Sequence, residues 1–547
     1  MLSILRPSIL LVLAICSHSV FAATYYISAN GSDSNNGTSN TSPWLHAPGM
    51  TGCSSNCQNK AYGQNGFNIP SPGDRFILRG GDTWYWTGNG AADGVSHAVG
   101  LPWVFGWDPV HSAVWDGSSS SHIYIGVDHT WWNSAVCGSA WCRPIMDGGN
   151  PVSTAPVARC KPTGAFLAID SWKYGDLDDL EFTGLCDDGS QNAYGALAYL
   201  IHNGGGQRAD YRNITNLYFH GVTTTNTSAA TNGYAAIGSS YDTAATNDFF
   251  IGDVCDNSDG SSTVLICFFQ GTANVSQSVF RNAWQGIVTN NALDIHDNLF
   301  ELIHNPSPGS GHANAMEWNT GYPGRPHYFY NNVVRNIDAA VTLWTCAETG
   351  QTDSYFNNVV FSTTGWAIAN ANYNNAGNAC ASSTGTSAFF SNTLVGLSGT
   401  GSYAPWNSNL QNNFLIDSSW RDNVSSPINE IDTTSATASA FGFTSGNNYM
   451  PTSSDCNGNA SASGCPIGKG GNLTSVCGAI SDANAKSACL LDTTLGPAYD
   501  SVHHRVTGTV RTPTARPASG SWDVGAFQYS STGSVVLPPV NVTAVAK

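Results

Sequence analysis

One short pattern of apolar and polar residues recurs through the middle of the chain, most clearly in residues 291–361. In IHDNLF, FYNNVV and YFNNVV, an apolar or aromatic residue precedes an Asn by three positions, and two apolar residues follow that Asn. Between the asparagines the alternation has a period of two, which predicts strands and not helices. The pattern recurs at Asn216, Asn298, Asn332, Asn358, Asn392 and Asn413, and more loosely at Asp179, Asp253 and Ser278.

The repeat length varies between roughly 20 and 40 residues, which is typical of a solenoid. We therefore predict an all-β fold, a parallel β-helix whose coils each supply three short strands. An Asn at the same sharp turn of successive coils can hydrogen-bond to its neighbours as an Asn ladder. An antiparallel sandwich is the alternative, but it does not keep one turn residue in phase over so many units. The predicted inward stack is Ile295, Phe329, Tyr355, Phe389 and Leu410.

The remaining segments differ from the regular coils in pattern. We predict a signal peptide at 1–22, an N-terminal cap with early coils at 23–160, and regular coils at 161–420. C-terminal coils and an irregular, cysteine-bearing capping segment follow at 421–530, and a linker or tail at 531–547. The capping segment contains one predicted helix over 482–491 and is expected to cover the last open edge of the β-helix.

The N-terminus resembles a secretory signal, with Arg6, an apolar run and small residues ending at Ala22. A lipid anchor on Cys16 is the less favoured alternative, because Ile15 stands where a small residue is needed. No later apolar run approaches ~20 residues, so no membrane span is predicted. We expect a secreted, extracellular protein, with the periplasm or the cell surface as the other compartments.

The chain contains 15 cysteines, and loss of Cys16 with the signal leaves an even number. An even number in a secreted chain indicates disulfides, although sequence alone leaves their connectivity open. Nearest-neighbour pairing gives Cys53–Cys57, Cys137–Cys142, Cys160–Cys186, Cys255–Cys267, Cys346–Cys380, Cys456–Cys465 and Cys477–Cys489.

Charge narrows the range of partners. The formal net charge is −17, which argues against nucleic acid and against anionic membrane surfaces. It also disfavours a polyanionic sugar, unless bound cations or a local basic patch reverse the field. We expect a monomer with a polysaccharide as its partner.

Two segments resemble a known family. TYYISANGSDSNNGTSNTSPWL near the N-terminus and RPASGSWDVGAFQY at 516–529 resemble the opening and closing segments of secreted proteins of the pectate-lyase-like superfamily. With the Asn ladder between them, the resemblance covers about residues 24–530 and implies a right-handed parallel β-helix. It implies no single activity, because one fold hosts many functions.

The resemblance places a substrate groove on the outer face of the strands that follow each loop: 196–203, 233–239, 265–271, 286–290, 314–319, 339–345 and 366–372. Among these strands Glu317 is the only carboxylate, and it points outward if Met316 and Trp318 point inward. The candidate catalytic residues are His312, Glu317, Arg325 and Arg335. The candidate substrate-binding residues are His304, His327, Trp344, Asp338 and Asp353.

Two reactions fit these residue types. In β-elimination on a uronate glycan, His312 would be the base, and Arg325 or Arg335 would neutralise the uronate carboxylate. In hydrolysis, Glu317 would be one of two carboxyl groups flanking the bond, with Asp338, Glu348 or Asp353 as the other. We favour a polysaccharide lyase. The alternatives are a glycoside hydrolase and a non-catalytic glycan-binding or surface β-helix protein.

Calcium is a candidate cofactor. Asp176 and Asp178 flank the inward Leu177, so their carboxylates project from one side of one strand and could begin an oxygen cage. A weaker candidate is the N-terminal motif Asp33-Ser34-Asn35-Asn36-Gly37. Turn chemistry is the alternative explanation for both, because Asp and Asn are common in turns.

Overall fold

The computed structural model describes residues 22–50, 52–57, 70–85, 103–105, 107–108, 113–148, 164–169, 172–184, 186–187, 198–202, 210–224, 234–238, 247–260, 265–269, 274–289, 294–304, 313–318, 325–338, 341–345, 347–363, 366–370, 385–397, 408–419 and 427–529. The predicted signal peptide at 1–22 lies almost wholly outside the described residues, as does the predicted tail at 531–547.

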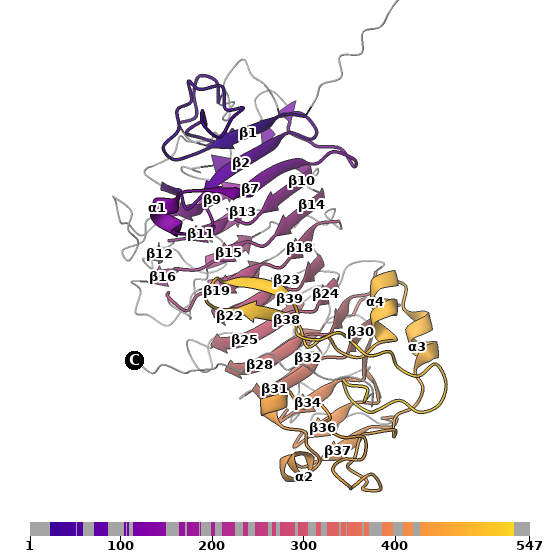
Figure 1. The fold of residues 1–547 in the computed structure, drawn as a ribbon. Helices are drawn as coiled ribbons and strands as arrows, with labels where there is room; N and C mark the ends of the chain where they lie inside the picture. The colour runs from indigo at the N-terminus through magenta and orange to yellow at the C-terminus, as the bar shows by residue number, and fades with distance from the viewer. Residues whose placement is uncertain are drawn as a thin grey trace, which may run out of the picture.

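Three parallel sheets run along the molecule, and successive strands of the chain pass from one sheet to the next (Figure 1). Sheet 1 has nine strands, in the order β32 (Trp366–Asn370), β29 (Val341–Thr345), β26 (Met316–Trp318), β23 (Gln285–Thr289), β20 (Leu265–Phe269), β17 (Tyr234–Gly238), β13 (Ala198–His202), β9 (Gly164–Ala168) and β4 (Trp103–Val104). All seven strands predicted to carry the groove are in this sheet.

Sheet 2 has twelve strands: β1 (Thr24–Ile27), β2 (Arg75–Gly80), β7 (Ile123–Trp132), β10 (Lys173–Asp178), β14 (Asp210–Thr215), β18 (Phe249–Ile251), β21 (Asn274–Ser276), β24 (Asp294–His296), β27 (Tyr328–Tyr330), β30 (Thr352–Phe356), β33 (Thr386–Phe390) and β35 (Ser408–Gln411). Sheet 3 also has twelve: β3 (Thr83–Tyr85), β8 (Ile145–Asp147), β11 (Glu181–Thr183), β15 (Tyr218–Phe219), β19 (Val254–Asp256), β22 (Val279–Ala283), β25 (Leu299–His304), β28 (Val333–Asp338), β31 (Val359–Thr363), β34 (Thr393–Val395), β36 (Phe414–Ile416) and β37 (Ile431–Thr433).

Smaller elements decorate these sheets. Three strand pairs are β5 (Trp107–Asp108) with β6 (Ala113–Val114), β12 (Cys186–Asp187) with β16 (Thr223–Thr224), and β38 (Pro497–Asp500) with β39 (Arg505–Thr509). The helices are α1 (Ser134–Cys137), α2 (Ser435–Ala440), η2 (Ser445–Asn447), α3 (Thr474–Ala479) and α4 (Ala483–Cys489). Helix α4 confirms the helix predicted over 482–491, and Asp482 caps it by accepting from the Ala485 amide at 2.8 Å.

The all-parallel sheets confirm the right-handed parallel β-helix. The predicted inward stack is also confirmed, because Ile295, Phe329, Tyr355, Phe389 and Leu410 pair in register on consecutive strands of sheet 2. All five side chains are at most 1% exposed. Within the described residues, no helix has the length and apolar character that a membrane crossing needs.

The Asn ladder forms between sheets 2 and 3. Each side-chain amide donates to the side-chain oxygen one coil further on, at 2.9–3.2 Å, and the last Asn donates to a glutamate at 3.0 Å. Each side-chain amide also donates to a backbone carbonyl of the preceding coil, so both of its N–H groups are used. The ladder runs through Asn298, Asn332, Asn358, Asn392, Asn413 and Glu430.

Two of the predicted ladder positions are displaced by one residue. Asp179 and Asn216 occupy the left-handed turn position, with φ of 59° and 57°, as Asp297 does beside Asn298. The ladder position in the Asn216 coil is Leu217, whose backbone amide donates to Asp253 at 2.8 Å. Short polar residues suit the left-handed and the ladder positions alike, so the sequence pattern could not separate them.

Disulfides form at five of the predicted pairs, namely Cys53–Cys57, Cys137–Cys142, Cys255–Cys267, Cys456–Cys465 and Cys477–Cys489. Cys160, Cys346 and Cys380 lie outside the described residues, so the pairs Cys160–Cys186 and Cys346–Cys380 stay predictions.

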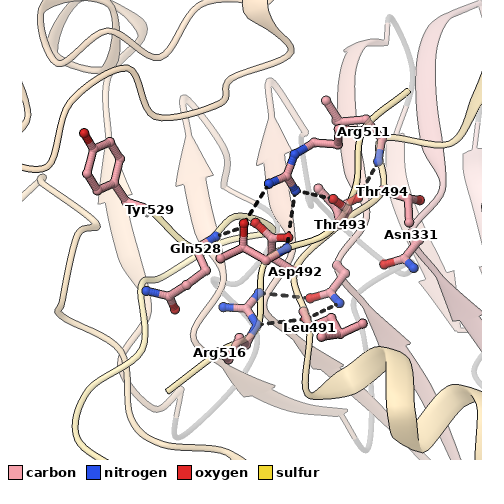
Figure 2. A network of polar contacts seen from close by, with 12 residues as sticks. Asn331, Leu491, Asp492, Thr493, Thr494, Arg511, Arg516, Gln528 and Tyr529 are labelled. Carbon is pink, nitrogen blue, oxygen red and sulfur yellow. Dashed lines mark hydrogen bonds and ion pairs between the residues drawn. The ribbon is translucent and has the colours of Figure 1, made fainter. Parts of the chain in front are cut away.

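The C-terminal segment does more than cover the end of the β-helix. After β37 and α2 it turns back, and β38 and β39 lie across the middle strands of sheet 3 (Figure 1). Figure 2 shows the polar network that fastens it. Arg511 pairs with the buried Asp492 at 2.7 Å, and Arg516 donates to the Asn357 side chain at 3.0 Å. Burial lowers the pKa of Arg516 to about 10.

Candidate functional site

Strand β26 presents the carboxylate predicted for the groove. Met316 and Trp318 are completely buried, whereas Glu317 between them keeps 9% of its surface exposed. In register, Glu317 lies beside Val288 on one neighbouring strand and beside Trp344 on the other. Strand alternation assigns the Glu317 side chain to the outer face of sheet 1, and its part in a substrate site stays a prediction.

A buried ion pair, His327 with Asp353, packs against the inward side chain of this strand. The indole of Trp318 stacks on the His327 ring, with centroids 4.9 Å apart and an interplanar angle of 18°. His327 Nδ1 lies 3.1 Å from Asp353 Oδ2, and the His327 amide donates to the same carboxylate at 2.8 Å. Neither His327 nor Asp353 has exposed surface, so in this structure they hold Trp318 and do not face a ligand.

Other predicted residues lie at the edges of sheet 1. His304 and Asp338 pair in register at the ends of β25 and β28, where the chain leaves sheet 3 for sheet 1. His304 is partly exposed and Asp338 is exposed. Arg325, also partly exposed, lies on the opposite side, between β26 and β27. His312 and the side chain of Trp344 fall outside the described part of the chain.

Arg335 is not brought to this face. It belongs to β28 of sheet 3, where its guanidinium lies 3.3 Å from Glu301 and 3.4 Å from the Asn448 side chain. Both partners lie on sheet 3 or in the C-terminal segment. Sequence reasoning had placed Arg335 on a loop beside the groove, but the residue lies on a strand of sheet 3. Its partner Asn448 in the C-terminal segment is far away in sequence.

Asp294 is a titratable residue near this site that sequence reasoning missed. It starts β24, in register with Tyr328 on the next coil. Burial and the neighbouring Asp482 raise its pKa to about 6, against the opposing charges of His296, Arg325 and His327. Within the described residues, its Oδ1 atom is buried without a hydrogen-bond partner. Since Asp482 lies far along the chain, no local signal could have indicated this shift.

We expect Asp294→Asn to stabilise the protein at neutral pH. A carboxyl whose folded pKa is raised from 3.8 to about 6 stabilises the fold when protonated, and this contribution disappears as pH rises through that interval. The loss amounts to about 3 kcal/mol at most. Urea unfolding between pH 4 and pH 8 should show the wild type losing stability while Asp294→Asn does not. The exposed Asp455→Asn variant is the control, and an unchanged difference across this range would contradict the assignment.

Both calcium candidates are engaged by protein groups. Asp176 lies 2.8 Å from His122 Nδ1 and accepts from the Asn213 amide, and Asp178 accepts from Tyr124, Thr215 and Asn216. Asp33 accepts from the backbone amides of Leu45, His46 and Ser54. Among the described residues, no cluster of three or more His, Cys, Asp or Glu has a metal-binding arrangement. The calcium hypothesis stays a prediction.

No family model matches this chain, and no curated protein does. Solved structures with similar folds include the GH136 lacto-N-biosidase from Eubacterium ramulus, with a TM-score of 0.42, 12% identity, and 75% of this chain and 67% of that chain covered. A rhamnogalacturonan lyase has a TM-score of 0.41 and 14% identity, covering 74% and 84%. A pectate lyase has a TM-score of 0.37 and 12% identity, covering 93% and 96%. The strand register described above establishes the parallel β-helix independently of these similarities.

Proposed function

We propose that this protein is a secreted carbohydrate-active enzyme that binds a glycan along the outer face of sheet 1. The observation that carries the proposal is the position of Glu317, the outward carboxylate of a strand whose two other side chains are fully buried. His304 and Asp338 flank it at one edge of the sheet, and Arg325 at the other. Acid, base and cationic groups around one strand suit proton transfer on a polysaccharide.

The reaction we propose is β-elimination on a uronate-containing glycan. A base removes the proton beside the uronate carboxylate, the glycosidic C–O bond breaks, and the leaving oxygen takes up a proton. In this scheme His312 is the base, Arg325 neutralises the uronate carboxylate, and Glu317 accepts hydrogen bonds from the imidazole or from sugar hydroxyls. Arg335 has no part in the scheme, because it pairs with Glu301 on sheet 3.

Glycoside hydrolysis is the second candidate. It needs two carboxyl groups on opposite sides of the scissile bond. Of the three possible partners for Glu317, Asp353 is buried against His327, whereas Asp338 and Glu348 keep exposed surface. Burial of Asp353 leaves Asp338 and Glu348 as the possible second carboxyl groups of a hydrolase.

Ultraviolet absorbance of the unsaturated uronate product tests the proposal. The secreted protein is mixed with a panel of polyuronates, with and without EDTA, and we expect the absorbance to rise. We expect Glu317→Gln to lower the rate by about 10- to 100-fold, because a hydrogen bond to a charged group contributes about 1.5–3 kcal/mol. The control is Glu301→Gln, which removes a carboxylate of sheet 3.

The other outcomes separate the alternatives. A rise in absorbance that EDTA abolishes would support a metal-dependent lyase, with Asp176 and Asp178 as candidate calcium ligands. New reducing ends on a neutral glycan, without an unsaturated product, would identify a hydrolase. Full activity in Glu317→Gln would remove this residue from the mechanism. Binding without any cleavage would leave a glycan-binding β-helix protein.

A further inference from the structure

A cleft lies on a different face of the molecule from the strand that carries Glu317. It has a volume of about 650 Å³ and lies between the outer face of sheet 3 and the segment 502–506, which includes the turn between β38 and β39. The residues that line it include His129, Trp141, Arg143, Glu181, Tyr218 and His504. The volume lies within the range of small-molecule sites, about 300–1,000 Å³. Glu317 belongs to sheet 1, so this cleft is separate from the proposed groove.

Tyr218 lines the cleft with a largely buried side chain. Its ring is sandwiched between His220 at 4.1 Å and His504 at 4.4 Å, with interplanar angles of 6° and 5°. The residue is 5% exposed, and its hydroxyl has no hydrogen-bond partner among the described residues. Burial and the carboxylates around it raise its pKa, so the hydroxyl stays protonated and can both donate and accept.

The charged side chains around the cleft already form ion pairs with other protein groups. Arg143 pairs with Asp179 at 2.8 Å and donates to the backbone carbonyls of His503 and His504 at 3.1 Å. His220 lies 3.0 Å from Glu181 and 2.7 Å from Asp259. These two carboxylates raise the pKa of His220 to about 9 in spite of its burial, so the imidazole is charged at neutral pH. An ionic ligand would therefore meet no uncompensated partner in this part of the cleft.

The remaining features suit a ligand with hydroxyl groups and an apolar face. Glu181 accepts hydrogen bonds and Tyr218 both donates and accepts. Trp141, held edge-to-face against His129 at 4.3 Å, contributes a partly exposed aromatic surface to the same cleft. Pyranose rings carry hydroxyl groups around their rim and C–H groups on their faces, which aromatic surfaces contact favourably.

We propose that this cleft binds a neutral sugar residue, held between sheet 3 and the C-terminal hairpin β38–β39. Such a ligand would contact Glu181 and Tyr218 on the β-helix and the segment 502–506 on the hairpin. It would therefore strengthen the attachment of the hairpin by binding the folded state only. The proposal does not depend on the reaction assigned to Glu317.

Isothermal titration of the full-length secreted protein tests the proposal. The probes are neutral hexoses, pentoses and their disaccharides, with glucuronate and galacturonate as charged comparators. We expect at least one neutral sugar to bind and the uronates to bind more weakly. Tyr218→Phe should weaken binding by about tenfold, the upper end for one hydrogen bond. It should leave the melting temperature unchanged, because the hydroxyl has no protein partner among the described residues.

Tyr330→Phe is the matched control. Tyr330 is also buried, is stacked between His296 at 4.6 Å and Phe356 at 4.9 Å, and lies outside the cleft. This variant should bind sugar like the wild type. The proposal is overturned if no neutral sugar in the panel binds, if uronates bind as well as neutral sugars, or if Tyr218→Phe binds like Tyr330→Phe.

Discussion

Replacing Arg212 with Met is expected to lower the free energy of unfolding by about 3–5 kcal/mol. Arg212 is 1% exposed and Asp248 is not exposed, and both lie in the interior between consecutive coils. The guanidinium holds both carboxylate oxygens, and its Nη1 atom donates to the Ile169 carbonyl at 3.0 Å. Removing the arginine leaves the Asp248 carboxylate buried without its counter-ion. The resulting loss in the free energy of unfolding is larger than the net stabilisation that the intact ion pair provides.

Urea unfolding at pH 7 measures this effect, and two further variants identify its cause. Arg212→Met combined with Asp248→Leu should recover most of the loss, because no charge then stays buried. Arg335→Met removes the partly exposed pair with Glu301 and should cost less than about 1 kcal/mol. A double variant as unstable as Arg212→Met would show that packing, and not the unpaired carboxylate, dominates.

Asn358→Ala is expected to cost about 3–5 kcal/mol, because its side chain serves several buried groups that each lose about 1–3 kcal/mol when left unpaired. The Asn358 amide donates to the Phe329 carbonyl at 2.9 Å and to Asn392 at 3.0 Å. Its oxygen accepts from the backbone and the side chain of Asn332 at 3.0 and 3.2 Å. The substitution interrupts the ladder in its middle.

Urea unfolding measures the loss of stability in Asn358→Ala, and hydrogen exchange locates it along the chain. Protection should fall first in the adjoining turns of the Asn332 and Asn392 coils, because coils of a solenoid depend on their nearest neighbours. The control is Asn336→Gly at an exposed left-handed position, with φ of 55°, which glycine tolerates. Equal effects of the two substitutions would show that the ladder bonds add nothing beyond turn geometry.

Asp253 shows how the ladder accommodates a different side chain. It accepts from the Leu217 amide at 2.8 Å, and its own amide donates to Ser278 at 3.1 Å. Burial raises its pKa well above the ordinary value. The Asp253 carboxyl thus takes the position that asparagine holds in later coils, which agrees with the loose match of Asp253 and Ser278 to the sequence repeat.

The site was predictable where the strand period alone decides direction. Glu317 faces outward and Met316 and Trp318 face inward because side chains alternate along a strand. The roles of His327 and Asp353 were not predictable in this way. Whether a loop histidine points to solvent or beneath the strand depends on the neighbouring coil, and here Trp318 and Asp353 enclose it.

The coil could be predicted from local sequence, because each coil repeats one rule: alternating side chains, a polar turn residue and an inward apolar residue. That rule established the three parallel sheets, the ladder from Asn298 to Asn413 and the inward stack. The contacts between coils, and those with the C-terminal segment, could be read only from the folded chain. The raised pKa of Asp294 and the cleft around Tyr218 both depend on residues that are far apart in the sequence. The ion pair between Arg212 and Asp248 joins equivalent positions of consecutive coils, but the apolar repeat does not mark those positions. Their energies depend on burial and on charges brought together by folding, and a local pattern contains neither.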